Sequence, residues 1–289
     1  MDEQLTQRLK GAARAAGADL VGVADVGRFD EVPLERHPKA IFPETRSVVA
    51  LAKRVTRGCL RGTEEGSQFA IYKQYANNWT PHRFLAMTTV AAATFLEDRR
   101  FEAVPLPDLP PETPPMGLPV APGRPAPNVM VDAADAAVRA GLGTIGYTGE
   151  LMTPRFGHRQ RVQLILTDAE LAPDPLCETD VCDRCGQCAA ACPLDAFSGE
   201  SERSILGRSF RVAGIDARLC ARCENGASPN PYHSAGRPER GAALCMRECM
   251  VHLEAEGLLE DKFREPFRKR PAWRVDRTGT PLPTGEGQG

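Results

Sequence analysis

Four cysteines lie close together in the second half of the chain: Cys182, Cys185, Cys188 and Cys192. The first three come at intervals of three residues, the fourth comes four residues later, and a proline follows it. With this spacing, three thiolates hold one [4Fe–4S] cluster while the fourth binds a second cluster. A tight loop lets three sulfurs converge on one cluster, whereas the fourth residue is expected to start a helix that points away. The stretch therefore predicts iron–sulfur chemistry.

Zinc binding and disulfide formation are the alternative uses of closely spaced cysteines. Zinc sites usually have two separated cysteine pairs, and not four cysteines that end in Cys-Pro. Nine of the ten cysteines lie between residues 177 and 249, so they form a local group and not a dispersed disulfide framework. Thiols of this kind need a reducing compartment to keep their metal.

A second group of cysteines follows: Cys220, Cys223, Cys245 and Cys249. The total of eight is the number that two [4Fe–4S] clusters require. The crossing pattern predicts one ligand set made of Cys182, Cys185, Cys188 and Cys249. It predicts a second ligand set made of Cys192, Cys220, Cys223 and Cys245. Two cysteines remain: Cys177 is either a substitute ligand or, like Cys59, a free buried thiol.

The rest of the chain must position these clusters. Its 289 residues can bury a full core, and we predict three parts: a cofactor-binding and substrate-binding core at 1–172, a cluster domain at 173–255, and a C-terminal helix with a flexible tail at 256–289. The net charge of −2 gives no indication of nucleic acid or an anionic membrane as a partner. No apolar leader or run of about 18 apolar residues is present, so we expect a cytoplasmic protein without a membrane span.

Hydrophobic patterns predict the elements of the core. Apolar runs predict strands at residues 19–24, 47–52 and 161–167. Helical patterns are found at residues 5–16, 68–98, 131–139 and 253–267, with a break expected before Pro81. The aromatic residues within 68–98 form either core packing or one wall of a pocket. The proline-rich stretch 105–127 is either a linker or, as we prefer, a long ordered loop within one domain, of the kind that acts as a lid or a binding loop.

Four glycines occur between residues 140 and 151: Gly141, Gly143, Gly146 and Gly149. The first three fit the GxGxxG pattern, but a predicted helix precedes them where a dinucleotide-binding fold requires a strand. They would instead leave backbone exposed to a flat ligand. A basic turn follows, with Arg155, His158, Arg159 and Arg161, and it either binds an acidic substrate or is solvated.

Several segments together resemble the epoxyqueuosine reductase and reductive dehalogenase superfamily. They are residues 17–23, 42–48, 131–143, 153–157, 167–168 and the first cysteine run. The resemblance implies an α+β protein with a nitroreductase-like α/β core that binds a base-off corrinoid (cobalamin), followed by a bacterial ferredoxin-like domain with two [4Fe–4S] clusters. It implies electron supply from ferredoxin or flavodoxin and reductive removal of oxygen or halogen from a small organic substrate.

The resemblance also implies roles for single residues. Asp132 matches the aspartate that donates a proton in epoxyqueuosine reductases, and a buried acid with a raised pKa could do so near neutral pH. The alternative role of Asp132 is to cap the helix that follows it. Reductive dehalogenases use a tyrosine with a basic residue, for which Tyr147 and Arg155 are candidates. Arg155 and the four glycines are further implied to contact the corrinoid.

The sequence departs from the epoxyqueuosine reductases in its second cysteine group. Ala242 occupies the first cysteine position there, Met250 replaces a proline, and Cys223 is the expected replacement ligand. No counterpart of the helical repeats that contact transfer RNA follows, whereas the proline-rich stretch is similar to the longer dehalogenase loop. Two alternatives stay open: a two-cluster electron-transfer protein without corrinoid, and an epoxyqueuosine reductase acting on transfer RNA. The near-neutral charge makes nucleic acid an unexpected partner.

Overall fold

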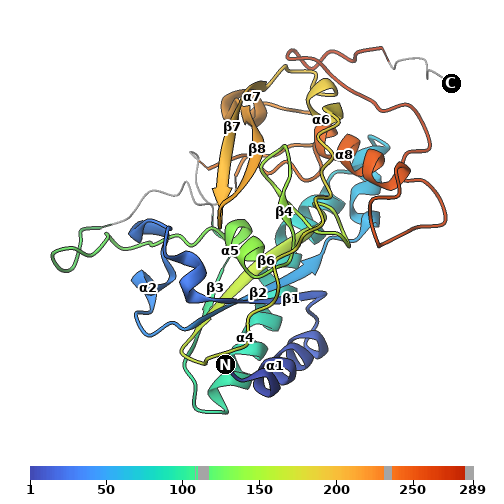
Figure 1. Ribbon diagram of the computed structural model, residues 1–289. Coiled ribbons are helices and arrows are strands. Elements are labelled where there is room, and N and C mark those ends of the chain that lie inside the picture. Colours follow the sequence, from blue (N-terminus) through green and yellow to red (C-terminus); the bar gives the residue numbers. More distant parts are fainter. Residues whose placement is uncertain (108, 110–116, 231–235, 284–289) are drawn as a thin grey trace.

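A four-stranded antiparallel sheet forms the centre of the N-terminal part, in the order β1-β2-β6-β3 (Figure 1). The computed structural model describes residues 1–107, 109, 117–230 and 236–283. The strands are β1 (Leu20–Asp25), β2 (Ser47–Arg54), β3 (Ala103–Leu106) and β6 (Gln160–Thr167). The strands predicted from the apolar runs are confirmed as β1, β2 and β6. Residues 47–52 of β2 are buried throughout, because this strand is central and both faces of the sheet are covered.

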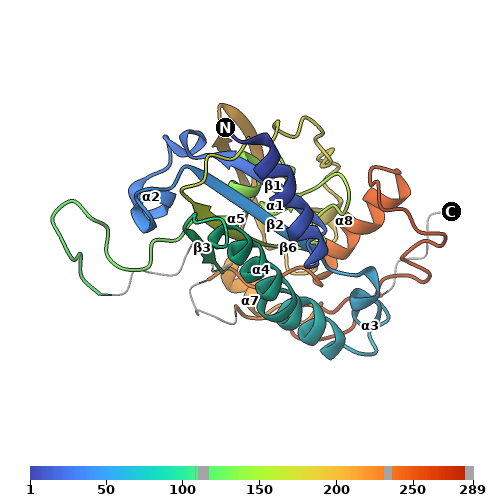
Figure 2. The same ribbon diagram turned by 90° about the horizontal axis from the view of Figure 1, so that it is seen from below.

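One face of the sheet is covered by α1 (Glu3–Ala15) and α4 (Ala86–Glu97), which lie beside each other in Figure 2. Their apolar residues pack against Val49 and Leu51 of β2. The opposite face carries α5 (Ala133–Arg139), which packs against Val48 and Ala50. Successive residues of a strand point to opposite faces, so β2 supplies both halves of the core.

The helix before α4 does not break at Pro81. Residues Tyr72–Leu85 form a continuous π-helix that contains Pro81 and runs directly into α4. The predicted break is therefore wrong. Wide π turns accommodate a residue that has no N–H to donate, and the Gln163 side chain donates to the carbonyl of Pro81 at 2.9 Å. β6 thus helps to hold this helix in place.

The C-terminal part contains the cysteines (upper part of Figure 1). It is built from the hairpin β7 (Phe197–Ile205) and β8 (Arg208–Ile215) and from α6 (Gln187–Ala190), α7 (Ala217–Ala221) and α8 (Leu244–Ala255). The sequence analysis did not predict the hairpin. The expected helix at Cys192 is also misplaced, since α6 ends before this residue.

The predicted helix at 253–267 is wrong. It is α8 that ends here, because Gly257 adopts a left-handed conformation with φ of +67° and the amide of Leu258 returns to the carbonyl of Leu253. This is a common glycine-dependent way to end a helix. Leu259 and Phe267 are nevertheless buried, so the segment after α8 packs back onto the core as an extended strap.

Shorter elements connect these parts: α2 (Pro38–Ile41), α3 (Arg61–Glu64), β4 (Thr144–Ile145), β5 (Leu151–Met152) and the 3-10 turns Val26–Phe29, Leu34–Arg36 and Arg57–Leu60. The protein is thus a mixed α+β fold. Within the proline-rich loop at 105–127, residues 108 and 110–116 lie outside the described residues, so the prediction of an ordered loop stays a prediction. In the part of the chain that the structure describes, no helix is long and apolar enough to cross a membrane.

Candidate functional site

The thiols of Cys182, Cys185, Cys188 and Cys249 lie near one another. Burial raises the pKa of Cys249 well above its ordinary value, and the negative charges of Cys188, Cys182 and Cys185 raise it further, with a smaller effect from Cys245. Burial likewise raises the pKa of Cys188 to about 11, with Cys182 and Cys185 adding to the effect. Such charge interactions weaken with distance, so these four residues form one group, called the first thiol group below.

A second thiol group contains Cys192, Cys220, Cys223 and Cys245. Burial raises the pKa of Cys245 to about 12, the other three thiolates add to this, and Arg240 opposes it. A cavity lined by the same four cysteines lies between Phe197 and Leu244. A metal that binds thiolates displaces their protons. Four convergent sulfurs around a largely apolar cavity suit an iron–sulfur cluster.

Helix α8 contributes one thiol to each group. Cys245 and Cys249 lie one turn apart on the same face of this helix, and α8 packs against α6, which carries Cys188. Backbone amides also point at the sulfurs: Tyr147 N–H is 3.3 Å from Cys182 Sγ, and Ala196 N–H is 3.4 Å from Cys192 Sγ. Such hydrogen bonds help to set the potential of a bound cluster.

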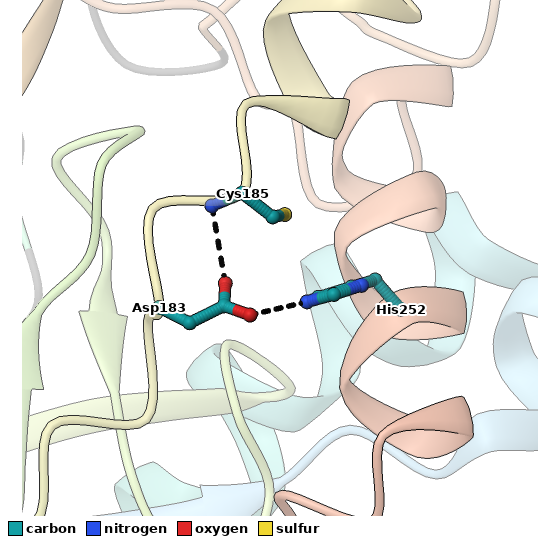
Figure 3. A group of neighbouring side chains, drawn as sticks. All are labelled: Asp183, Cys185 and His252. Carbon is teal, nitrogen blue, oxygen red and sulfur yellow. Dashed lines mark hydrogen bonds and ion pairs between the residues drawn. The ribbon is translucent and has the colours of Figure 1, made fainter.

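The loop that carries the first thiol group is attached to α8 by an aspartate and a histidine (Figure 3). Asp183 accepts a hydrogen bond from the amide of Cys185 at 3.1 Å, and its other oxygen is 2.7 Å from Nε2 of His252. Asp183, Cys185 and His252 have their ligand atoms within 4.8 Å of one another. The hydrogen bonds explain this arrangement: they fix the loop so that Cys185 lies beside the other thiols.

A polar cavity of about 210 Å³ lies next to the second thiol group. Three of the side chains that line this cavity form a hydrogen-bonded group. Tyr72 Oη donates to Glu239 at 2.7 Å, and Arg161 donates to Glu239 at 2.9 Å and to Tyr72 Oη at 3.0 Å. Although burial raises the pKa of Glu239, Arg161 outweighs this and lowers it to about 2. Burial and the Glu239 charge raise the pKa of Tyr72 well above its ordinary value. The carboxylate is therefore ionised and the phenol protonated.

His158 lies in the same cavity wall and is uncharged. Burial and the nearby charge of Arg159 lower its pKa to about 4. Its Nε2 lies 2.9 Å from the carbonyl oxygen of Met246, which requires the proton to be on Nε2. The basic turn predicted from the sequence is therefore not a solvated one: Arg159 and Arg161 point inward, and only Arg155 is exposed.

Asp132 lines the polar cavity, but the expectation of a raised pKa is wrong. Burial would raise it, yet the charge of Arg203 and the hydrogen bond from the amide of Asp135 lower it below its ordinary value. Arg203 lies 2.8 Å from one carboxylate oxygen. The other oxygen accepts from the amides of Ala134 and Asp135 at 3.0 Å each. The role as a helix cap is therefore observed, whereas the role of Asp132 as a proton donor stays a prediction.

Replacing Asp132 by asparagine tests this assignment. Asparagine caps helices well, so we expect only the Arg203 ion pair to be lost, at a cost of about 1–3 kcal/mol. The pKa of Asp132 is lower in the folded protein than in the unfolded chain. The ionised carboxylate therefore stabilises the fold above the ordinary pKa of aspartate, and this stabilisation is lost as the pH falls through the lowered pKa. The difference in the free energy of unfolding between wild type and Asp132→Asn should therefore shrink on acidification. Urea unfolding across a pH series measures it, and a constant difference would contradict the assignment.

The other predicted site residues do not face the polar cavity. Tyr147 donates its hydroxyl to Glu200 at 2.9 Å on the exposed surface, and Arg155 stacks over the ring of Phe156. A Cβ at Gly141 would come within 2.1 Å of the Pro175 carbonyl oxygen, and one at Gly143 equally close to that of Met152. These two glycines are required by contacts within the chain, which corrects their interpretation as a surface for a flat ligand. Gly146 lies against the Met152 side chain, and Gly149 has only Arg237 near it.

The sequence analysis included Tyr72 among the aromatic residues that form either core packing or a pocket wall, and the structure places it in the lining of the polar cavity. It missed Glu239 and Arg240. Both lie in the spacer between Cys223 and Cys245, where no motif distinguishes them. Their chemistry depends on partners far away in the chain, such as Arg161 and Glu150. The only available signal was the density of charged residues in an otherwise irregular spacer.

Comparison with known proteins supports the iron–sulfur assignment. The family model of the 4Fe-4S binding domain (Fer4) matches residues 178–198. The chain is 26% identical to a tetrachloroethene reductive dehalogenase of Sulfurospirillum multivorans, over 72% of this chain and 43% of the relative. It is 26% identical to an epoxyqueuosine reductase of Listeria monocytogenes, over 57% of this chain and 40% of the relative. The homologues are thus reductases, and the resemblance found in the sequence is confirmed.

A solved reductive dehalogenase, whose structure was reported to suggest a mechanism for B12-dependent dehalogenation, has the same fold. The TM-score is 0.51 at 15% identity, over 96% of this chain and 39% of that chain. The present chain spans less than half the length of the curated relatives that it matches. The comparison establishes a shared fold and an iron–sulfur domain in a relative of these reductases.

Proposed function

We propose that this protein is an iron–sulfur reductase that passes electrons through two [4Fe–4S] clusters to an organic acceptor in the polar cavity. The position of Arg240 carries the proposal. This side chain lines both the polar cavity and the cavity between the cysteines of the second thiol group. An acceptor in the polar cavity would therefore be separated from the second cluster by a single side chain.

The two thiol groups would be the two ligand sets. Cys182, Cys185, Cys188 and Cys249 would hold cluster one, and Cys192, Cys220, Cys223 and Cys245 would hold cluster two. When bound, the clusters supply single electrons at low potential. Cys185 is exposed, whereas Cys220 and Cys245 are buried. A donor such as ferredoxin or flavodoxin would thus approach cluster one, and electrons would leave from cluster two.

The polar cavity does not fit a corrinoid. The polar cavity measures about 210 Å³, which is below the range of roughly 300–1,000 Å³ for drug-sized ligands, and a corrinoid is larger still. Gly141 and Gly143 face the chain's own carbonyls and leave no flat surface there. We therefore derive no step through a corrinoid. The nitroreductase-like description of the core and the three-part domain division remain predictions.

The cavity suits a small neutral or anionic substrate. Among the described lining residues, four arginines outnumber three carboxylates: Arg159, Arg161, Arg237, Arg240, Asp132, Glu150 and Glu239. Burial also lowers the pKa of His82. The relatives' names suggest reductive removal of halogen or oxygen, so substrate screening should begin with small halogenated compounds and epoxides. The expectation that nucleic acid is not a partner stays a prediction, which binding of a transfer RNA stem loop would contradict.

Metal content tests the proposal. Protein purified without oxygen and reconstituted with iron, sulfide and hydroxocobalamin should contain about eight irons per chain, as two [4Fe–4S] clusters require. Electron paramagnetic resonance of the reduced protein should show two interacting clusters. Four irons or fewer would contradict the proposal. Eight irons with stoichiometric cobalt would show that the cavity opens to admit a corrinoid, and eight irons without any substrate turnover would indicate an electron carrier that serves a partner enzyme.

A further inference from the structure

Arg240 is a buried cation with an unused hydrogen-bond donor. Its side chain is 4% exposed. Nη2 donates to the carbonyl of Thr148 at 2.9 Å and to the carboxylate of Glu150 at 2.7 Å. Nη1 is also buried, and it has no partner among the described residues. Leaving a buried N–H group without an acceptor costs about 1–3 kcal/mol of stability. An acceptor on a bound ligand would remove this cost.

The second thiol group is where such an acceptor would lie. Arg240 lines the cavity between the four cysteines together with Phe197 and Leu244. Its charge acts on two of the thiols, since it lowers the pKa of both Cys220 and Cys245 against the effect of their burial. The guanidinium is thus close enough to this cavity for its charge to be felt at the sulfurs.

We propose that Arg240 donates its free Nη1–H to a sulfur of the cluster in the second thiol group and thereby raises the reduction potential of that cluster. The proposal rests on the function proposed above. It assigns to Arg240, which also lines the polar cavity, a tuning role that acts through the cluster.

The physical reason is the charge of the reduced cluster. Reduction adds one negative charge, so a nearby cation and an N–H···S hydrogen bond stabilise the reduced form more than the oxidised form. Arg240 is buried, so salt screens its effect little. Glu150 partly offsets the charge of Arg240, but its side chain is 42% exposed and its own charge is more strongly screened.

The surroundings of the first thiol group differ in charge. The carboxylate of Asp183 lies beside Cys185 and 2.7 Å from His252 Nε2, and Arg184 on the same loop is paired with Asp180 at 2.9 Å. Among the described residues, we find no buried cation equivalent to Arg240 that acts on Cys188 or Cys249. Electron transfer from cluster one to cluster two would therefore be downhill, toward the polar cavity.

The experiment is a redox titration of the reconstituted full chain, followed by electron paramagnetic resonance. In Arg240→Gln, we expect the ratio of reduced to oxidised cluster two at a fixed potential to be at least tenfold lower than in the wild type. For a one-electron couple, this corresponds to a reduction potential that is lower by about 59 mV. Arg240→Lys should recover part of the shift because it keeps the charge. Glu150→Gln should shift cluster two in the opposite direction, because it removes the anion that offsets Arg240. Arg46→Gln, which removes an exposed cation paired with Glu170, is the matched control and should shift neither cluster.

The outcomes separate the two proposals. A wild-type protein with only one cluster overturns the proposed function and this inference with it. Two clusters with the same potentials in wild type and Arg240→Gln overturn this inference alone. Should Arg240→Gln fail to fold, Arg240→Lys decides, because it removes the Nη1–H donor and keeps the charge; a potential of cluster two equal to that of the wild type in this variant contradicts the proposed hydrogen bond.

Discussion

Replacing Cys249 with alanine should abolish the cluster of Cys182, Cys185 and Cys188 and leave the other cluster in place. Although Cys249 belongs by sequence to the later cysteines, its thiol lies with this first thiol group. A cluster with three remaining cysteine ligands in a partly exposed loop loses much of its stability. We therefore expect about four irons per chain instead of about eight, measured after reconstitution without oxygen.

The reciprocal variant completes this prediction. Cys192→Ala should abolish the cluster of the second thiol group, even though Cys192 follows Cys188 directly in the first run. The paramagnetic spectrum of Cys249→Ala should match that of Cys182→Ala, and the spectrum of Cys192→Ala should match that of Cys220→Ala. Cys59→Ala and Cys177→Ala are controls that should retain all the iron. If the spectrum of Cys249→Ala instead matched that of Cys220→Ala, and the spectrum of Cys192→Ala matched that of Cys182→Ala, each cysteine run would hold its own cluster and the prediction would be wrong.

The second large effect is expected at Glu64, which joins the core to the C-terminal strap. Its carboxylate pairs with Arg247 on α8 and, at 2.6 Å, with Arg268 in the strap. The Glu64 side chain is 4% exposed and that of Arg247 is completely buried. Removing one partner of a buried ion pair costs about 3–5 kcal/mol because the other charge stays buried without compensation. Glu64→Gln should lower the free energy of unfolding by about this amount.

The dependence on pH makes this prediction specific. Burial raises the pKa of Glu64, but Arg268 and Arg247 outweigh it, so the pKa lies below its ordinary value of 4.5. The ion pairs of Glu64 therefore stabilise the fold fully at a pH above the ordinary pKa of 4.5. This stabilisation is lost as the pH falls through the lowered pKa of the folded protein. The difference between wild type and Glu64→Gln should therefore disappear in acid, as measured by urea unfolding of the reconstituted protein.

Glu65 offers a matched control one residue away. It pairs with Arg61 at 3.0 Å and with Arg270 at 2.7 Å, but the Arg270 side chain is 70% exposed. Exposed ion pairs contribute at most about 1 kcal/mol. Glu65→Gln should therefore change the free energy of unfolding by no more than this amount. Equal effects at both positions would mean that the Glu64 ion pairs do not hold the strap.

Local patterns were sufficient for much of the fold. The apolar runs identified β1, β2 and β6 because strands that are covered on both faces must be apolar on both faces. The position of Asp132 identified the start of α5 because its carboxylate accepts the first free amides of the helix. The cysteine spacing likewise identified the iron–sulfur domain, since the loop geometry of such a site is fixed by neighbouring residues.

Contacts between distant residues decided the rest. The polar cavity joins Tyr72, Arg161 and Glu239, and no pattern in the sequence relates them. Asp132 has a lowered pKa because Arg203 comes from a hairpin that was not foreseen. Charge, burial and hydrogen bonding act through space, so the cysteine spacing was enough to predict an iron–sulfur domain, whereas the side chains around it and their charges follow only from the fold.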